Sequence, residues 1–169
     1  MASKQNEFLG IFKETFSARV DGDHSDWTGG QIKSNVAGLD PILRVRRNGE
    51  AKKGESFELA DLKTTYRKKL VIIEYDVKKL PLSNLLKYWP YIIGDLDKSP
   101  NQDIIICQFS DWYSYASYRD LWEWTLKKMK VDPERKVNIV GMQFDHGGDD
   151  KKVCSLAINS SIDWIKDQC

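Results

Sequence analysis

Hydrophobic positions along this chain follow two different periods, which predict helices and strands in alternation. At the start the period is helical, because hydrophobic residues recur three or four positions apart over residues 6–20. They are Phe8, Ile11, Phe12, Phe16 and Val20. Later segments carry the short apolar runs of strands. Strands are predicted over residues 41–46, 56–66, 69–77, 103–109 and 136–144, and further helices after Ser83 and over 114–130 and 155–167.

Polar segments with glycine separate these elements and are predicted to be loops. Residues 21–40 are of this kind, with Trp27 as their largest hydrophobic side chain, and residues 47–55 are another. A two-residue turn at 67–68 is expected to join the strands 56–66 and 69–77 into a hairpin. Ser83 is a candidate N-cap for the helix that follows it. Pro90 is predicted to interrupt that helix.

The order of the elements predicts an α/β (α+β) fold with a mixed β-sheet flanked by helices. The early strands are joined by hairpins and therefore run antiparallel, whereas the later strands are separated by helices, as parallel strands usually are. A chain of 169 residues is large enough for one core. We therefore expect a single domain over residues 1–169.

Composition narrows the class of protein. Hydrophobic residues make up 41 % and charged residues 30 %, which excludes a disordered chain. No apolar run approaches the roughly 18 residues of a membrane span, so no membrane partner is expected. The 3 cysteines cannot all pair within one chain, which favours a reducing cytoplasm. Glycine-rich phosphate loops do not occur in the sequence, so no nucleotide cofactor is expected.

The predicted hairpin brings acidic side chains together. With its turn at 67–68, Asp61 lies opposite Glu74. Side chains alternate along a strand, so Glu74, Asp76 and Lys78 share one face. Opposed carboxylates repel each other, and a cation such as Mg²⁺ offsets that repulsion. The alternative is a set of exposed acids paired with neighbouring lysines on a solvated strand.

These residues resemble the catalytic motif of a known enzyme family. Asp61 lies thirteen positions before Glu74, which follows the apolar run 70–73 and begins an acid-x-acid pattern with Asp76. The arrangement is similar to the catalytic hairpin of the restriction-endonuclease-like nucleases, the PD-(D/E)xK superfamily. That family's core of helix, three strands, helix and strand can be laid on residues 6–109, with the later elements as C-terminal additions.

The resemblance implies a role for each matching residue. Asp61 corresponds to the first metal-binding aspartate and Glu74 to the second acid, while Asp76 stands where the family most often has lysine. The missing ammonium group is then supplied by Lys78, or by Lys87 from the following helix. In an alternative register, Asp76 and Lys78 belong to the (D/E)xK motif itself.

The resemblance also implies a reaction and its partners. Asp61, Glu74 and Asp76 would bind Mg²⁺ (or Mn²⁺) for the hydrolysis of DNA phosphodiester bonds. Glu14 resembles the additional helix acid of many members. The net charge of +1 gives no general attraction to DNA, so backbone contacts are expected from local basic clusters. The candidates are Arg44, Arg46, Arg47, Arg67, Lys68 and Lys69. A sequence-specific enzyme of this size is expected to act as a homodimer on a symmetric site or as one module of an assembly.

A second hypothesis is a non-catalytic α/β protein that binds a protein or polynucleotide partner. The departure from the family pattern at Asp76 favours it. The aromatic segment 109–124 either stacks on a ligand or packs against the sheet. Segment 145–150, with His146 among acids and glycines, is either a metal site or a polar turn.

Overall fold

The computed structural model describes residues 4–20, 24–32, 43–45, 51–53, 57–76, 81–95, 102–148 and 150–169. A five-stranded mixed sheet in the order β1-β4-β5-β6-β7 lies at its centre. The strands are β1 (Thr28–Ile32), β4 (Phe57–Tyr66), β5 (Lys69–Asp76), β6 (Ile104–Ser110) and β7 (Ile139–Asp145). β2 (Leu43–Val45) and β3 (Ala51–Lys53) pair with each other in a separate two-stranded sheet. The predicted α/β class with a mixed sheet is confirmed.

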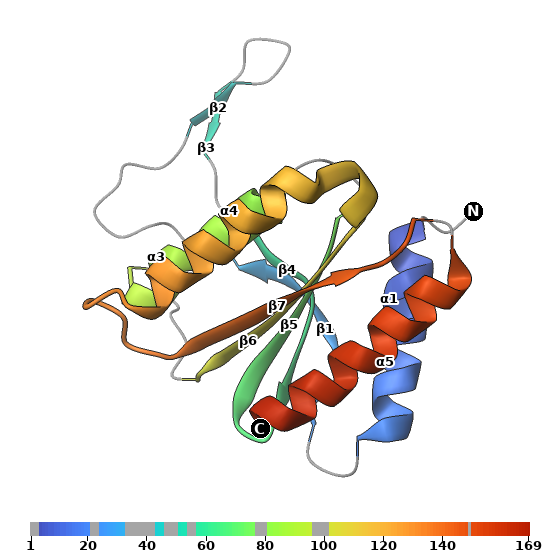
Figure 1. Ribbon diagram of the computed structural model, residues 1–169. Coiled ribbons are helices and arrows are strands. Elements are labelled where there is room, and N and C mark those ends of the chain that lie inside the picture. Colours follow the sequence, from blue (N-terminus) through green and yellow to red (C-terminus); the bar gives the residue numbers. More distant parts are fainter. Residues whose placement is uncertain are drawn as a thin grey trace.

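Helices cover both faces of the sheet (Figure 1). α1 (Lys4–Arg19) and α5 (Lys151–Gln168) contact each other on one face. α2 (Pro81–Leu86), α3 (Trp89–Ile93) and α4 (Trp112–Lys130) lie on the other face. Within the described residues, no helix has both the length and the hydropathy needed to cross a membrane.

Antiparallel and parallel pairing meet at β5. β1 pairs antiparallel with β4, and β4 pairs antiparallel with β5. β5, β6 and β7 run parallel, with α2 and α3 crossing between the first two and α4 between the last two. The β4–β5 hairpin has the predicted register, with Tyr66 opposite Lys69 and Leu62 opposite Ile73. Its turn residues Arg67 and Lys68 have φ values of 45° and 66°, as a two-residue hairpin turn of type I′ requires.

An irregularity in β4 shapes the region around Asp61. Thr28 pairs with Lys63 whereas Gly30 pairs with Ala60, so β4 has one residue more than β1 between these two pairs. Such a bulge bends its strand and redirects side chains. Leu62 accordingly packs on the α1–α5 face, whereas Ala60, two residues earlier, packs on the α2–α4 face. The bulge thus contains Asp61, at the point where the regular pairing of β4 with β5 ends.

The two faces of the sheet have different cores. Under α1 and α5 the core is aromatic, because Phe8, Phe12 and Phe16 occupy the buried positions of α1. Their rings contact Tyr75 and Phe109 of the sheet, among other aromatic side chains. Under α2, α3 and α4 the core combines aliphatic residues of the sheet with Tyr88, Tyr91 and Trp122 of the covering segments, and it is polar toward the carboxyl ends of the parallel strands. The polar part holds the candidate site.

The sequence prediction was wrong in placing the first strand of the main sheet. Residues 21–40 were expected to form a loop, yet β1 lies within them and pairs with β4. Its Gly29-Gly30 pair has low strand propensity, and hydrogen bonds to β4 override that preference. The predicted strand 41–46 contains β2, which pairs with β3 from the expected loop 47–55 and lies outside the main sheet.

Smaller differences concern helix starts. Ser83 lies inside α2 rather than capping it. Asp111 and Asp150 cap α4 and α5, so both helices begin earlier than residues 114 and 155. These carboxylates accept hydrogen bonds from the first backbone amides of each helix, the usual function of an N-cap aspartate. The interruption before Pro90 is confirmed, since α2 ends and α3 begins there.

Replacing Gly141 with alanine is expected to destabilise the fold by about 1–3 kcal/mol. A Cβ atom at Gly141 would lie 2.8 Å from Cη2 of Trp122, a buried ring that has little room to move. Gly10→Ala in α1 is the matched control, because no heavy atom lies within 4 Å of the added Cβ. This variant should gain about 0.5–1 kcal/mol from helix propensity. Urea unfolding measures both effects, and equal stability of the two variants would contradict the close packing of Trp122 on Gly141.

Candidate active site

A buried carboxyl group lies at the centre of the candidate site. Glu74 follows the apolar part of β5, points to the α2–α4 face and is only 1 % exposed. Its Oε1 atom forms an ion pair with Nζ of Lys87 at 2.7 Å. The Tyr88 hydroxyl donates a hydrogen bond to the same oxygen. The buried Glu74 carboxyl group thus contacts one cationic donor, the Lys87 ammonium, and one neutral donor, the Tyr88 hydroxyl.

Local structure places Lys87 and Tyr88 over Glu74. The two residues form the turn between α2 and α3, and Pro90 lies in the first turn of α3. Proline cannot donate the backbone hydrogen bond that a continuous helix would need at this position. The neighbouring Trp89 indole donates to Oδ2 of Asp132 at 2.6 Å, which ties the turn to the segment after α4. The helix interruption therefore holds both side chains against the sheet.

Asp61 is the second carboxylate of the site. It lies in the β4 bulge, and its Oδ2 accepts a hydrogen bond from the backbone amide of Tyr75 at 2.7 Å. Tyr75 directly follows Glu74 in the chain. The Asp61 side chain therefore bridges from β4 to β5 where the regular strand pairing has ended, and it is held beside the Glu74 carboxyl.

Burial dominates the electrostatics of Glu74. Loss of hydration raises the pKa of Glu74 from its ordinary value of 4.5 to about 8. The Lys87 ammonium opposes this rise, and the Asp61 carboxylate adds to it by repulsion. Burial likewise raises the pKa of the Tyr88 hydroxyl well above 10, so that group stays a hydrogen-bond donor. The Glu74 carboxyl therefore keeps its proton to a higher pH than an exposed glutamate does.

A row of polar side chains continues from Glu74 across the parallel strands. Glu74 pairs in register with Gln108 of β6, which pairs with Gln143 of β7, and all three are buried. Each glutamine donates a hydrogen bond from its side-chain amide nitrogen. Gln108 donates to the backbone carbonyl of Phe109, and Gln143 donates to the backbone carbonyl of Arg119. The Oε1 atoms of both glutamines are buried without a hydrogen-bond partner in the described part of the chain. The core beside the site is therefore polar over three strands.

The next row lies at the carboxyl ends of the same strands and includes Asp76. Asp76 pairs in register with Ser110, and Ser110 with Asp145. The Asp76 carbonyl lies 3.1 Å from Nε2 of His146, whose ring stacks on Tyr75. Asp76 is thus held one step beyond Glu74 on the same face, at the rim of the sheet.

Residues 145–148 form a polar turn, as in the second of the two predictions for segment 145–150, and Asp149 lies outside the described residues. The backbone amide of Gly148 donates to Nδ1 of His146 at 3.1 Å, and the amide of Gly147 donates to Oδ1 of Asp145 at 2.9 Å. Asp150 caps α5. The imidazole and both carboxylates therefore have structural hydrogen bonds. No group of three His, Cys, Asp or Glu side chains that could hold a metal ion occurs within the described residues.

Three of the predicted catalytic residues come together, namely Asp61, Glu74 and Lys87. Lys78 lies outside the described residues. Glu14 is exposed on α1, which covers the face opposite to the one that Glu74 points to, so it does not join the site. Sequence reasoning missed Tyr88. The signal that could have found it is its place beside Lys87, just before the helix-interrupting Pro90.

The predicted DNA-backbone residues fall in two places. Arg67, Lys68 and Lys69 lie at the turn of the β4–β5 hairpin, five residues along β5 from Glu74 and therefore about 17 Å away. The Lys69 ammonium donates to the backbone carbonyl of Gln168, and the Arg67 guanidinium lies over the Tyr66 ring. Arg44 belongs to β2. Arg46 and Arg47 lie outside the described residues.

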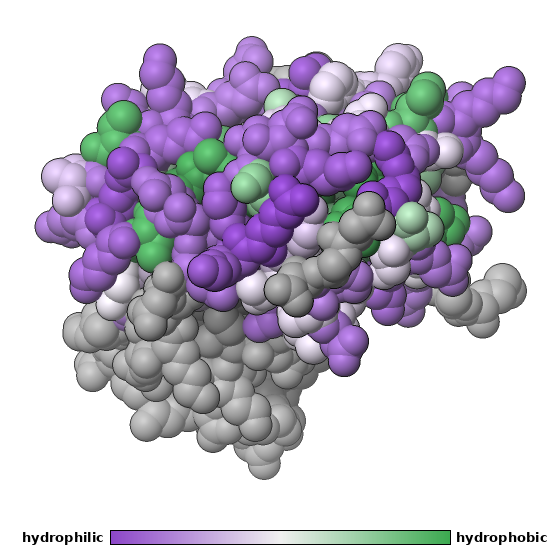
Figure 2. Space-filling view, turned by 90° about the horizontal axis from the view of Figure 1, so that it is seen from below, coloured by the Kyte–Doolittle hydropathy of each residue, from purple (hydrophilic) through white to green (hydrophobic). Residues whose placement is uncertain are grey.

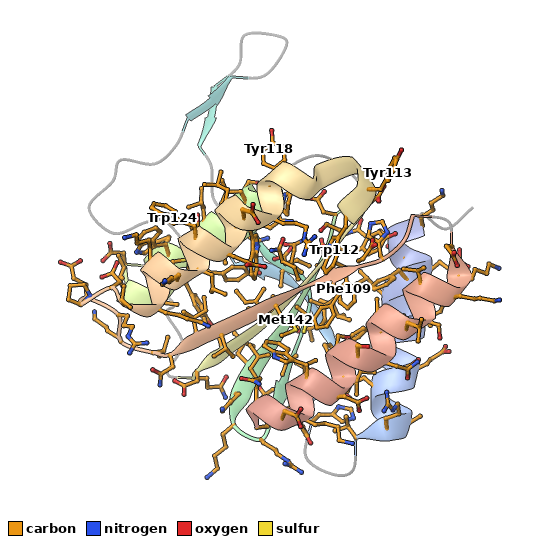
Figure 3. The ribbon with its side chains drawn as sticks, viewed as in Figure 1. Phe109, Trp112, Tyr113, Tyr118, Trp124 and Met142 are labelled. Atoms are coloured by element: carbon orange, nitrogen blue, oxygen red, sulfur yellow. The ribbon has the colours of Figure 1, made fainter. Side chains whose placement is uncertain are left out.

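Only part of the aromatic segment 109–124 packs against the sheet, and the predicted stacking on a ligand stays a prediction. Phe109 and Trp122 are buried and pack in the core. Tyr113, Tyr118 and Trp124 are exposed on α4, and Figure 3 shows Tyr113 and Tyr118 pointing away from the sheet. The face seen in Figure 2 is mostly hydrophilic with separate hydrophobic spots, the ordinary pattern of a protein surface. Core packing therefore explains only part of this aromatic content.

No protein-family model, curated protein or solved structure matches this chain. The chemistry of the site residues is therefore the basis on which a function can be inferred. Two carboxyl groups beside an ammonium and a phenol can bind a hard cation or exchange a proton near neutral pH.

The free energy of unfolding is expected to fall as pH rises through the range between 4.5 and about 8. In this range folded Glu74 keeps a proton that the unfolded chain releases. The free energy of unfolding therefore decreases as pH increases, by up to about 1.4 kcal/mol per pH unit. Glu74→Gln should remove this part of the pH dependence, whereas Glu14→Gln on exposed α1 should retain it. Urea unfolding between pH 5 and 9 measures the difference, and identical profiles for both variants would contradict a protonated, buried Glu74.

Proposed function

We propose that this protein is a metal-dependent nuclease that hydrolyses DNA phosphodiester bonds. One observation carries the proposal: Glu74 is buried against Lys87 and Tyr88, with Asp61 beside it where β4 separates from β5. The resemblance of Asp61 and Glu74 to the PD-(D/E)xK motif supports the reaction type, with Lys87 supplying the ammonium that the motif's lysine provides in the family and that Asp76 replaces here. The order of helix, strands and crossover helices around the hairpin is compatible with the family's core.

The residues present suit a divalent metal ion. Mg²⁺ is commonly bound by one or two protein carboxylates and keeps several waters. Asp61 and Glu74 supply two such groups, and both protein contacts of Glu74 fall on Oε1, so Oε2 is the atom proposed to bind the ion. Asp76 lies at the rim of the same face, and within the described residues it does not form a group of three with Asp61 and Glu74 that could hold a metal ion. It is proposed to become the third oxygen ligand when a bound ion draws it toward the other two carboxylates. When bound, Mg²⁺ or Mn²⁺ would polarise a phosphate and lower the pKa of a bound water.

The remaining side chains hold and move protons. Lys87 is partly exposed and lies 2.7 Å from Glu74, so its ammonium can neutralise negative charge that develops on the phosphate. Tyr88 fixes the Glu74 carboxyl by donating to Oε1. Because burial raises the pKa of Glu74 to about 8, cation binding must displace its proton. Metal affinity is therefore expected to rise with pH up to that value.

The proposed compartment is the reducing cytoplasm. Cys107, Cys154 and Cys169 are all free thiols, and burial raises the pKa of each one. A raised pKa keeps a thiol protonated and slow to oxidise.

The basic residues of segment 44–47 and of the hairpin turn are the proposed contacts to the DNA backbone.

Surface hydrophobicity on α4 favours a second candidate function, the binding of a partner without catalysis. Tyr118, Leu121 and Trp124 are 38 %, 42 % and 56 % exposed, and Lys128 lies over the Trp124 ring. Aromatic side chains next to a cation can stack on nucleic-acid bases or pack against a protein. In this reading the Glu74–Lys87 pair is a structural feature of the core.

A metal titration separates the two candidates. For the wild-type protein, Mg²⁺ or Mn²⁺ is expected to raise the thermal midpoint and to permit cleavage of plasmid and linear DNA. Glu74→Gln and Asp61→Asn should each lower the cleavage rate by at least about 100-fold. Glu14→Gln, on the other face of the sheet, should cleave as the wild type does.

The thermal midpoints of the metal-free variants serve as the folding control. Variants that stay folded and lose both cleavage and the metal response would support the nuclease. A wild-type protein with neither metal response nor cleavage would contradict the nuclease and favour the binding protein, and DNA retention lost in Trp124→Ala would then locate the binding surface.

A further inference from the structure

His146 is a buried residue that directly follows β7 and bonds to the ends of both other parallel strands. It is only 3 % exposed. Its backbone amide donates to the carbonyl of Ser110, the last residue of β6, at 3.1 Å. Its Nε2 atom lies 3.1 Å from the carbonyl oxygen of Asp76, the last residue of β5. One residue therefore joins the carboxyl ends of all three parallel strands.

The partners of the imidazole determine which of its nitrogens carries the proton. The backbone amide of Gly148 donates to Nδ1 at 3.1 Å, so the ring proton is on Nε2. Nε2 therefore donates to the Asp76 carbonyl. Gly147 and Gly148 have φ values of 66° and 60°, in the left-handed region that glycine adopts without strain. This turn brings the Gly148 amide back to the ring.

Aromatic packing holds the imidazole in this position. Its ring stacks on the Tyr75 ring, with the centroids 4.7 Å apart. Tyr75 in turn contacts Phe8 of α1, with 4.4 Å between the ring centroids. Side chains alternate along a strand, so the Tyr75 ring and the Asp76 carboxylate lie on opposite faces of β5. The aromatic core of the α1–α5 face thus fixes a ring that bonds to the backbone of a residue of the candidate site.

The His146 bond restrains β5 at a level where its strand pairing ends. Within the described residues, the regular pairing of β4 with β5 stops before Glu74. On the other side, Asp76 pairs in register with Ser110, where β6 ends. Asp76 therefore lies at the last step of the ladder, and the hydrogen bond from His146 holds its peptide group there.

We propose that His146 is a positioning residue for Asp76, the third carboxylate of the proposed metal site, and this role rests on the nuclease function proposed above. His146 does not contact the ion. Its Nε2–H group holds the Asp76 peptide and so fixes the point from which the carboxylate turns toward Asp61 and Glu74. Replacing a group that orients a metal ligand through hydrogen bonds commonly lowers metal affinity by about 10–100-fold.

Three substitutions separate the hydrogen bond from the packing of the ring. His146→Phe keeps a flat ring against Tyr75 but has no donor for the Asp76 carbonyl. His146→Asn can still accept from the Gly148 amide, but its side chain is too short to take the place of Nε2. His146→Gln loses the ring and can place an amide N–H where Nε2 lies.

Mn²⁺ affinity without DNA is the decisive measurement, from the electron paramagnetic resonance signal of the free ion. His146→Phe and His146→Asn should each bind Mn²⁺ about tenfold or more weakly than the wild type, whereas His146→Gln should stay within about threefold of it. Saturating Mn²⁺ should restore most of the DNA cleavage rate of the two weak binders, because their defect lies in affinity for the ion.

Gly141→Ala is the matched control for loss of stability. It is expected to weaken the fold from within β7 through Trp122, and it leaves His146 and its partners in place. It should therefore bind Mn²⁺ as the wild type does, and urea unfolding identifies the variants that are folded in the assay.

Equal Mn²⁺ affinity of the wild type, His146→Phe and His146→Asn would overturn the proposal and leave the nuclease intact. An equal loss of affinity in all three His146 variants, or the same loss in Gly141→Ala, would also overturn it and assign His146 a packing role. A wild-type protein that binds no Mn²⁺ would contradict the nuclease itself, and the positioning role would be wrong with it.

Discussion

A carboxyl group buried within a β-sheet constrains much of this structure. Glu74 has lost nearly all of its hydration, and a side chain of this kind is tolerated only when other groups satisfy it. Lys87 and Tyr88 provide those groups from the turn between α2 and α3. The break before Pro90, the burial of Tyr88 and the bulge at Asp61 all lie around this one buried carboxyl group. The α2–α3 turn and the β4 bulge are separated in the sequence, yet both lie around the same buried carboxyl group.

Polarity on this side of the sheet extends beyond a single residue. Glu74, Gln108 and Gln143 form a row across the parallel strands, from the α2–α3 turn over Glu74 to α4 over Gln143, while the opposite face carries aromatic rings from α1. An interior that must only be stable is served best by apolar packing, since buried polar atoms without partners cost free energy. The α2–α4 face therefore holds the candidate site, and the apolar packing of the α1–α5 face offsets the cost of its buried polar groups.

The sequence was sufficient for features that depend on neighbours in the chain. The two-residue turn at Arg67 and Lys68 determined the hairpin register, and with it the approach of Asp61 to Glu74. β1 was not predicted because Gly29 and Gly30 have low strand propensity. The strand forms through its hydrogen bonds to β4, which the local sequence does not indicate. The contact of Tyr88 with Glu74 was missed for a similar reason. It depends on how the crossover packs on the sheet, which no local pattern encodes.

The candidate site is contiguous in sequence, and this has a consequence for how it forms. Asp61, Glu74 and Tyr88 belong to one segment made of the hairpin and the turn that follows it, so the loops that must close are short. The strands beyond, β6 and β7, pair only after longer crossovers are complete. The chemically important groups can therefore meet early in folding, before the rest of the sheet is added.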